Sequence, residues 1–131
     1  MSKRSAATCS AVAALVLAHA AGAVGMESGF QTPSRNIACE ADQNPSGQRV
    51  LHCVLFLSSG TRGQKTWSMK LTGRANVRYV VANVATETPV LRYGRRWRWH
   101  GIVCTSRRVG LTCRNRSGHG WFLSRERQRV F

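Results

Sequence analysis

Apolar and polar residues alternate with a period of two over much of the chain after residue 30, which is the pattern of half-buried β-strands. The alternation is clear at residues 67–71 and again at residues 75–81. Gly73 lies between these two runs and predicts a hairpin turn. Residues 50–57 form a continuous apolar run, which is typical of a buried strand.

The same alternation returns at Trp97 and Trp99, which are interleaved with Arg96, Arg98 and His100. It places the indoles on one face of a strand and the cations on the other. We expect the tryptophans in the core and the arginines in water. The alternative is that exposed indoles and guanidiniums engage an anionic interface. Since no stretch outside the N-terminal segment has helical apolar spacing, the pattern predicts an all-β fold, a small antiparallel sandwich or barrel of about seven or eight strands.

The first residues have the three parts of a secretory signal peptide. A short basic stretch, Lys3-Arg4, precedes an apolar core at residues 11–18, and two A-x-A patterns end at Ala20 and Ala23. The apolar run is too short to span a bilayer. We therefore expect a signal peptide at residues 1–23, a short leader at 24–29 and a secreted or periplasmic domain at 30–131, with cleavage after Ala20 or Ala23 and no transmembrane segment in the mature chain.

Four cysteines remain after the signal peptide: Cys39, Cys53, Cys104 and Cys113. An even number in an exported chain predicts disulfides, and their spacing does not fit the close pairs of a zinc site. We expect neither a metal nor a cofactor. The first two cysteines flank a turn at residues 44–47, and the last two flank a four-residue loop at 107–110, so each pair can close a hairpin. We favour two hairpin disulfides, while pairing of the first two cysteines with the last two stays open.

The charge is extreme, with 20 Lys and Arg against 5 Asp and Glu and a formal net charge of +15. Such a surface attracts polyanions without specificity. The partners we expect are an anionic polymer, a lipid headgroup or an acidic protein, with non-specific nucleic-acid binding in vitro. The candidate anion-binding residues are Arg95, Arg96, Arg98, Arg107, Arg108 and His119. The alternative is that the arginines form only a solvated surface.

Two stretches of the chain carry a resemblance to a known group of proteins. The first is FQTPSRNIAC at residues 30–39, and the second comprises YG at 93–94, GLTCRN at 110–115 and GHGWFLSR at 118–125. Together they resemble a family of small secreted bacterial proteins of unknown function, which implies export and disulfides but no activity. Arg35 stands where that family has glycine, so this turn can have a different backbone, and Trp121 replaces a phenylalanine.

No catalytic residue is assigned, because the chain has no nucleophile elbow, no P-loop and no H-E-x-x-H motif. We expect an exported, non-catalytic binding domain. The alternative is a small secreted nuclease-like hydrolase, in which a histidine would pair with one of the carboxylates Glu40, Asp42, Glu87 and Glu126. A cavity with His119 or His100 near a carboxylate would favour the enzyme, and a convex arginine-rich face would favour binding. The sequence leaves the partner's identity and the oligomeric state open.

Overall fold

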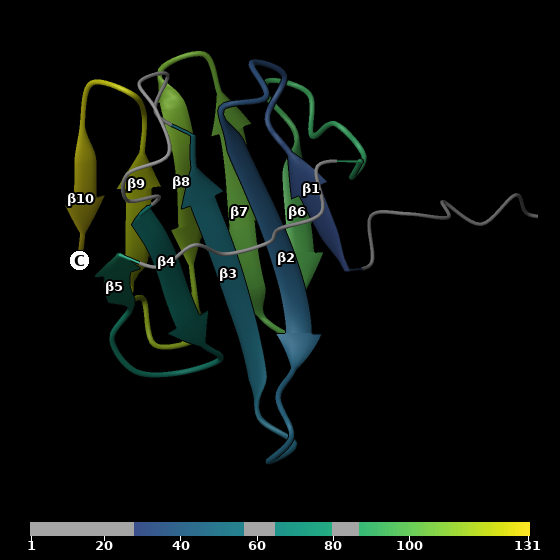
Figure 1. Cartoon of the computed structure of the whole chain (residues 1–131), viewed down its shortest axis with the longest axis vertical. Coiled ribbons are helices and arrows are strands. Elements are labelled where there is room, and N and C mark those ends of the chain that lie inside the picture. Colours follow the sequence, from purple (N-terminus) through teal and green to yellow (C-terminus); the bar gives the residue numbers. More distant parts are fainter. Residues whose placement is uncertain (1–27, 57–64, 80–86) are drawn as a thin grey trace, which may run out of the picture.

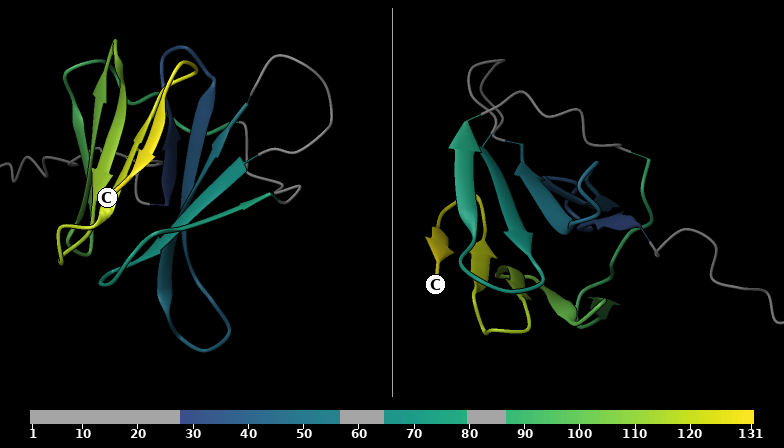
Figure 2. Two further views of the ribbon diagram at one scale, coloured as in Figure 1. Left: turned by 90° about the vertical axis from the view of Figure 1, so that its left-hand side faces the viewer. Right: turned by 90° about the horizontal axis from the view of Figure 1, so that it is seen from below.

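The computed structural model describes residues 28–56, 65–79 and 87–131. These residues contain ten strands and no helix. The strands form two antiparallel sheets of five strands each (Figure 1). The sheets face one another as a sandwich, which confirms the predicted fold class (Figure 2). The number of strands is larger than the seven or eight expected, because three-residue edge strands are too short to display an alternation. The expected signal peptide and most of the leader lie outside the described residues.

Each sheet is a meander in which consecutive strands are neighbours. The first sheet contains β1 (Gly29–Gln31), β2 (Ile37–Gln43), β3 (Arg49–Leu55), β4 (Lys65–Lys70) and β5 (Asn76–Tyr79). The second sheet contains β6 (Arg96–Trp99), β7 (Ile102–Arg107), β8 (Gly110–Arg114), β9 (Gly120–Leu123) and β10 (Gln128–Val130). Among the described residues no helix is long and apolar enough to cross a membrane.

The core lies between the two sheets and is built from matching rows of large side chains. In the first sheet the register aligns Phe30, Cys39, Cys53 and Trp67, all of which are buried. In the second sheet it aligns Trp97, Cys104, Cys113 and Trp121, which are also buried. The rings of Phe30 and Trp97 meet between the sheets with centroids 5.2 Å apart. Alternation therefore sends the other residues of each strand to the outer faces.

The two disulfides are Cys39–Cys53 and Cys104–Cys113, each between residues directly opposite one another on neighbouring strands. This confirms the hairpin pairing. The loop of the second hairpin is shorter than expected, because Arg107 and Gly110 pair as strand residues and leave only Arg108 and Val109 as the turn.

The two ends of the sandwich differ. We call the upper end the one that carries the β1–β2, β7–β8 and β9–β10 turns, at the top of Figure 1. At the opposite, lower end the β8–β9 loop is tied to the first sheet: Arg116 N donates to Leu71 O at 2.9 Å, and Asn115 Nδ2 donates to Gly73 O at 2.7 Å. Hydrogen bonds between the sheets thus close the lower end.

Candidate anion-binding surfaces

The outer face of the second sheet carries arginines from several strands. The strand register aligns Arg96 with Thr105, Thr112, Phe122 and Arg129 in one row across all five strands. The next row aligns Arg98, Val103, Arg114 and Gly120. We call this surface the basic face and define it by Arg96, Arg98, Arg114, Arg129, Phe122 and Phe131.

Aromatic rings hold some of these guanidiniums in place. The Arg114 guanidinium lies 4.5 Å from the centroid of the Phe131 ring, and that of Arg129 lies 5.5 Å from the same ring. The backbone of Phe131 pairs with Gly120, which stands between Phe131 and Arg114 and has no side chain. Phe131 can therefore reach across to Arg114. Arg127 similarly lies 5.2 Å from the centroid of Phe122.

The charge distribution differs between the two outer faces. Glu40 and Asp42 alternate with core residues of β2 and therefore lie on the outer face of the first sheet. The strands β6 to β10 contain no Asp or Glu, and Glu126 lies in the turn before β10. Among the described residues no arginine forms an ion pair with a described carboxylate, since the one charged contact is between His52 and Asp42. Within the described residues, the arginines of the basic face are thus not paired with a carboxylate side chain.

A second basic surface lies at the upper end of the sandwich. There the three turns lie at the top of Figure 1. Residues of these turns and of the segment before β6 line an open cavity of about 620 Å³. Its lining includes Arg107 at the end of β7, Arg108 from the β7–β8 turn and Arg125 from the β9–β10 turn. We call it the upper-end cavity. Its volume lies within the range typical of small-molecule sites.

The six candidate residues from the sequence do not form one site. Arg96 and Arg98 are exposed on the basic face, and Arg95 is exposed just before β6, where its carbonyl accepts from Ser106 N at 3.0 Å. Arg107 and Arg108 line the upper-end cavity.

His119 belongs to the β8–β9 loop at the lower end. Its Nδ1 lies 3.3 Å from Phe131 O, and its backbone N–H donates to Asn115 Oδ1 at 3.1 Å. These contacts fit a half-buried turn histidine.

Sequence reasoning missed Arg114, Arg125 and Arg129. The available signal was alternation in the last strands, where arginines stand two residues apart at Arg114 and Arg116 and again at Arg125, Arg127 and Arg129. Only the cross-strand register shows which of them share a face with Arg96 and Arg98.

One histidine does lie near a carboxylate, on the outer face of the first sheet. His52 Nδ1 is 2.7 Å from Ser68 Oγ, and its Nε2 is 3.8 Å from Asp42 Oδ1. Ser, His and Asp are the residue types of a serine hydrolase triad. Here they lie on the neighbouring strands β2, β3 and β4, whose backbone N–H groups form the hydrogen bonds of the sheet. Those N–H groups are therefore not available to form an oxyanion hole. In the described part of the chain, no three His, Cys, Asp or Glu side chains gather as metal ligands.

Comparison with known proteins gives one match. A family described only as a family of unknown function, DUF6636, matches residues 66–131, which is the half of the chain that runs from β4 to the C-terminus. No curated protein and no solved structure matches the chain.

Proposed function

The chain belongs to this family of unknown function, DUF6636, and we propose from its own surface that it is an exported, non-catalytic binding domain for an anionic component of the cell envelope or an acidic protein. The observation that carries the proposal is the basic face. Four arginines from β6, β8 and β10 share that face, and its strands contain no carboxylate.

The two buried disulfides support the exported location. Both lie in the core of a small domain, where they connect neighbouring strands. Disulfides of this kind persist in oxidising compartments and are rare in the cytosol. The signal-peptide pattern at residues 1–23 and the disulfides therefore lead to the same proposal, a secreted or periplasmic protein.

The geometry of the basic face fits an extended ligand with repeated charges. Arg98 on β6 and Arg114 on β8 are two strands apart, which corresponds to about 10 Å between their backbones. Guanidiniums bind phosphate and carboxylate bidentately, and those stacked on Phe131 are already partly ordered. The sheet offers no groove-reading helix, so we expect binding to nucleic acid to lack base preference.

The first prediction tests this face by salt dependence. Binding of the folded domain to duplex DNA, used as a defined polyanion, should weaken steeply with salt because counterions are released, with a log–log slope of about −0.9 per phosphate neutralised. The triple variant Arg98→Gln, Arg114→Gln, Arg129→Gln should reduce that slope by about 2 to 3. Fluorescence anisotropy at several salt concentrations measures it.

The matched control removes three positive charges from the first sheet and its lower end, as Arg49→Gln, Lys70→Gln, Arg78→Gln. It should change the slope by less than about 1. If both triple variants reduced the salt slope equally, net charge alone would explain the binding. That result would contradict a specific binding face. Absence of binding at about 50 mM salt would leave the arginines as solvated surface.

The alternative, a secreted hydrolase with a histidine–carboxylate pair, has one geometric counterpart among the described residues, His52 with Asp42. The upper-end cavity contains no histidine, so this cavity and the His52–Asp42 pair are separate. This separation supports a binding role. Cleavage of RNA or DNA by the purified protein that is lost in His119→Ala or His52→Ala would overturn the non-catalytic proposal.

A further inference from the structure

We propose that the upper-end cavity is a discrete site for a phosphate monoester, distinct from the basic face. Residues at the β1–β2, β7–β8 and β9–β10 turns line the cavity, and these turns lie at the top of Figure 1. Its charges, its neutral donors and its apolar rim each match one part of such a ligand.

The charge of the lining matches a dianion. Arg107, Arg108 and Arg125 contribute three positive charges, and Glu126 contributes one negative charge. The resulting excess of two positive charges is opposite in sign and similar in magnitude to the charge of a phosphate monoester near neutral pH, about −1.5 to −2. None of the three arginines is paired with a described carboxylate. The guanidiniums are therefore available for the charge-assisted, bidentate hydrogen bonds that phosphate oxygens accept.

One of these arginines is held in place by an aromatic ring. The Arg108 guanidinium lies 5.3 Å from the centroid of the Tyr93 ring, and both side chains line the cavity. Arg108 belongs to a two-residue turn whose flanking residues, Arg107 and Gly110, pair as strand residues. A short turn and a ring contact reduce the side-chain entropy that binding would otherwise cost.

The opposite wall of the cavity offers a neutral donor. Thr32 Oγ1 donates to Asn36 Oδ1 at 3.2 Å, and Ser34 Oγ donates to the same oxygen. Because these hydroxyls use the oxygen of the amide, its NH₂ group is left as the donor, and it has no acceptor among the described residues. Asn36 is half-buried and lines the cavity. A phosphate or ester oxygen could take the place of water as the acceptor for this NH₂ group.

The rim fits the organic part of the ester. Val109 is 71% exposed and Tyr93 is 39% exposed, and both are among the large hydrophobic side chains that the described surface leaves in water. They lie beside the arginines of the cavity. A bound phosphate at the arginines would therefore bring its ester group against Val109 and Tyr93, where burial of apolar surface adds affinity. Inorganic phosphate would gain only the polar contacts.

The second prediction uses glycerol 3-phosphate as the soluble probe, with inorganic phosphate and glycerol as the comparisons. Isothermal titration of the secreted, disulfide-bonded protein at about 150 mM salt should show one site, tighter for the ester than for inorganic phosphate. In NMR titrations the backbone amides of Asn36, Tyr93 and Val109 should shift. Vesicles containing phosphatidic acid form the second arm, which distinguishes a lipid headgroup from a soluble ester as the source.

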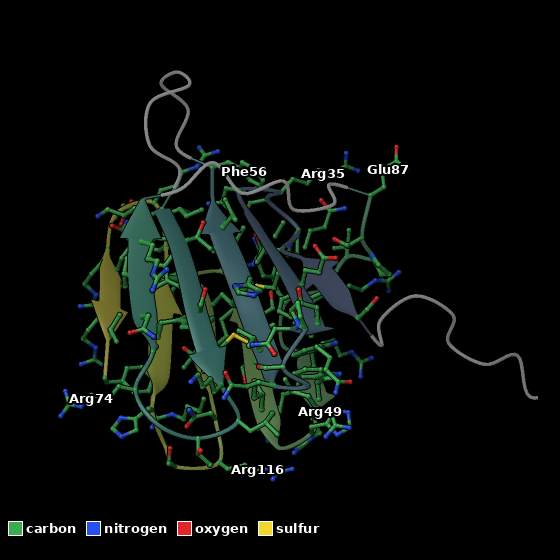
Figure 3. All side chains as sticks on the ribbon, turned by 60° about the horizontal axis from the view of Figure 1, so that its bottom comes forward. Arg35, Arg49, Phe56, Arg74, Glu87 and Arg116 are labelled. Atoms are coloured by element: carbon green, nitrogen blue, oxygen red, sulfur yellow. A yellow bond between two sulfur atoms is a disulfide. The ribbon has the colours of Figure 1, made fainter. Side chains whose placement is uncertain are left out.

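Paired variants make the test decisive. Arg107→Gln, Arg108→Gln should weaken ester binding about tenfold or more, since hydrogen bonds to charged groups are lost. The control Arg49→Gln, Arg74→Gln removes the same charge at the far end of the molecule, where Figure 3 labels both residues, and should change affinity less than twofold. Equal losses in the two double variants, equal affinity for the ester and inorganic phosphate, or shifts confined to the basic face would each overturn the proposal.

The two proposals can fail separately. The basic-face triple variant should weaken DNA binding and keep ester binding, and the cavity double variant should weaken ester binding and keep DNA binding. All of these substitutions are at exposed side chains, so thermal unfolding should stay close to that of the unaltered protein. If either variant weakened both DNA binding and ester binding, one diffuse positive field would explain both. That result would contradict a separate site in the cavity.

Discussion

At the scale of single residues, Arg35 has a backbone conformation that is unfavourable for a residue with a side chain. Its φ is 57°, in the left-handed region that glycine adopts freely. The conformation closes the β1–β2 turn, in which Arg35 N donates to Thr32 O at 2.8 Å and Pro33 takes the second position. Arg35 stands where the motif that this chain resembles has glycine. Its backbone nevertheless has a conformation that suits glycine.

The third prediction follows from this φ. Arg35→Gly should raise the free energy of unfolding by about 0.5–1 kcal/mol, because a left-handed L-residue costs about 1–2 kcal/mol that glycine avoids, less the added entropy of the unfolded chain. Urea denaturation measures it. Arg35→Ala removes the same charge without relieving the backbone and should give no gain. Equal stabilisation in both variants would assign the effect to charge.

At the scale of an element, β6 divides its residues between core and solvent. Trp97 is buried, while Arg96 and Arg98 are exposed. Trp99 is half-buried and stacks against Trp97 with centroids 6.3 Å apart. The strand therefore serves both as a wall of the core and as one edge of the basic face.

The fourth prediction separates these two roles. Trp97→Ala should lower the free energy of unfolding by about 3–5 kcal/mol, as expected for a large buried side chain, and Trp99→Ala should lower it by less. Arg98→Gln should leave stability within about 0.5 kcal/mol and affect polyanion binding instead. A Trp97 variant with an unchanged melting temperature and lost binding would show that the indole acts at an interface.

At the scale of the whole molecule, the two outer faces of the sandwich differ in charge, because Lys70 and Arg78 offset the two acids of the first sheet while the basic face has no acid. Glu40 and Asp42 lie on the outer face of the first sheet, and the basic face covers the second. The arginine-lined cavity opens at the upper end, whereas hydrogen bonds between the sheets close the lower end. If the domain binds an anionic partner as proposed, this uneven distribution would favour an approach through the second sheet.

The fifth prediction concerns the mature protein. The secreted chain should begin at Ala21 or Val24 and contain no free thiol. Its intact mass should be about 4 Da below the fully reduced value, since each of the two disulfides removes two hydrogens. Mass spectrometry before and after reduction and alkylation measures both features. An unprocessed chain, or four thiols that react without reduction, would contradict it.

Much of the fold was predictable because its determinants are local. Alternation at residues 67–71 and at Trp97 and Trp99 predicts strands, since side chains on a strand must point to opposite faces. Cysteines equally distant from a turn predict hairpin disulfides, and both were confirmed. Edge strands β1 and β10 were missed because three residues carry too little pattern.

The sequence by itself determined that this protein is a basic, disulfide-bonded all-β chain, because composition, alternation and cysteine spacing are properties of neighbouring residues. Only the tertiary structure decided which arginines lie together. Arg98, Arg114 and Arg129 share a face because the strand register aligns β6, β8 and β10. The cavity likewise unites Asn36 with Arg108, which are brought together when turns from both sheets meet at one end of the sandwich.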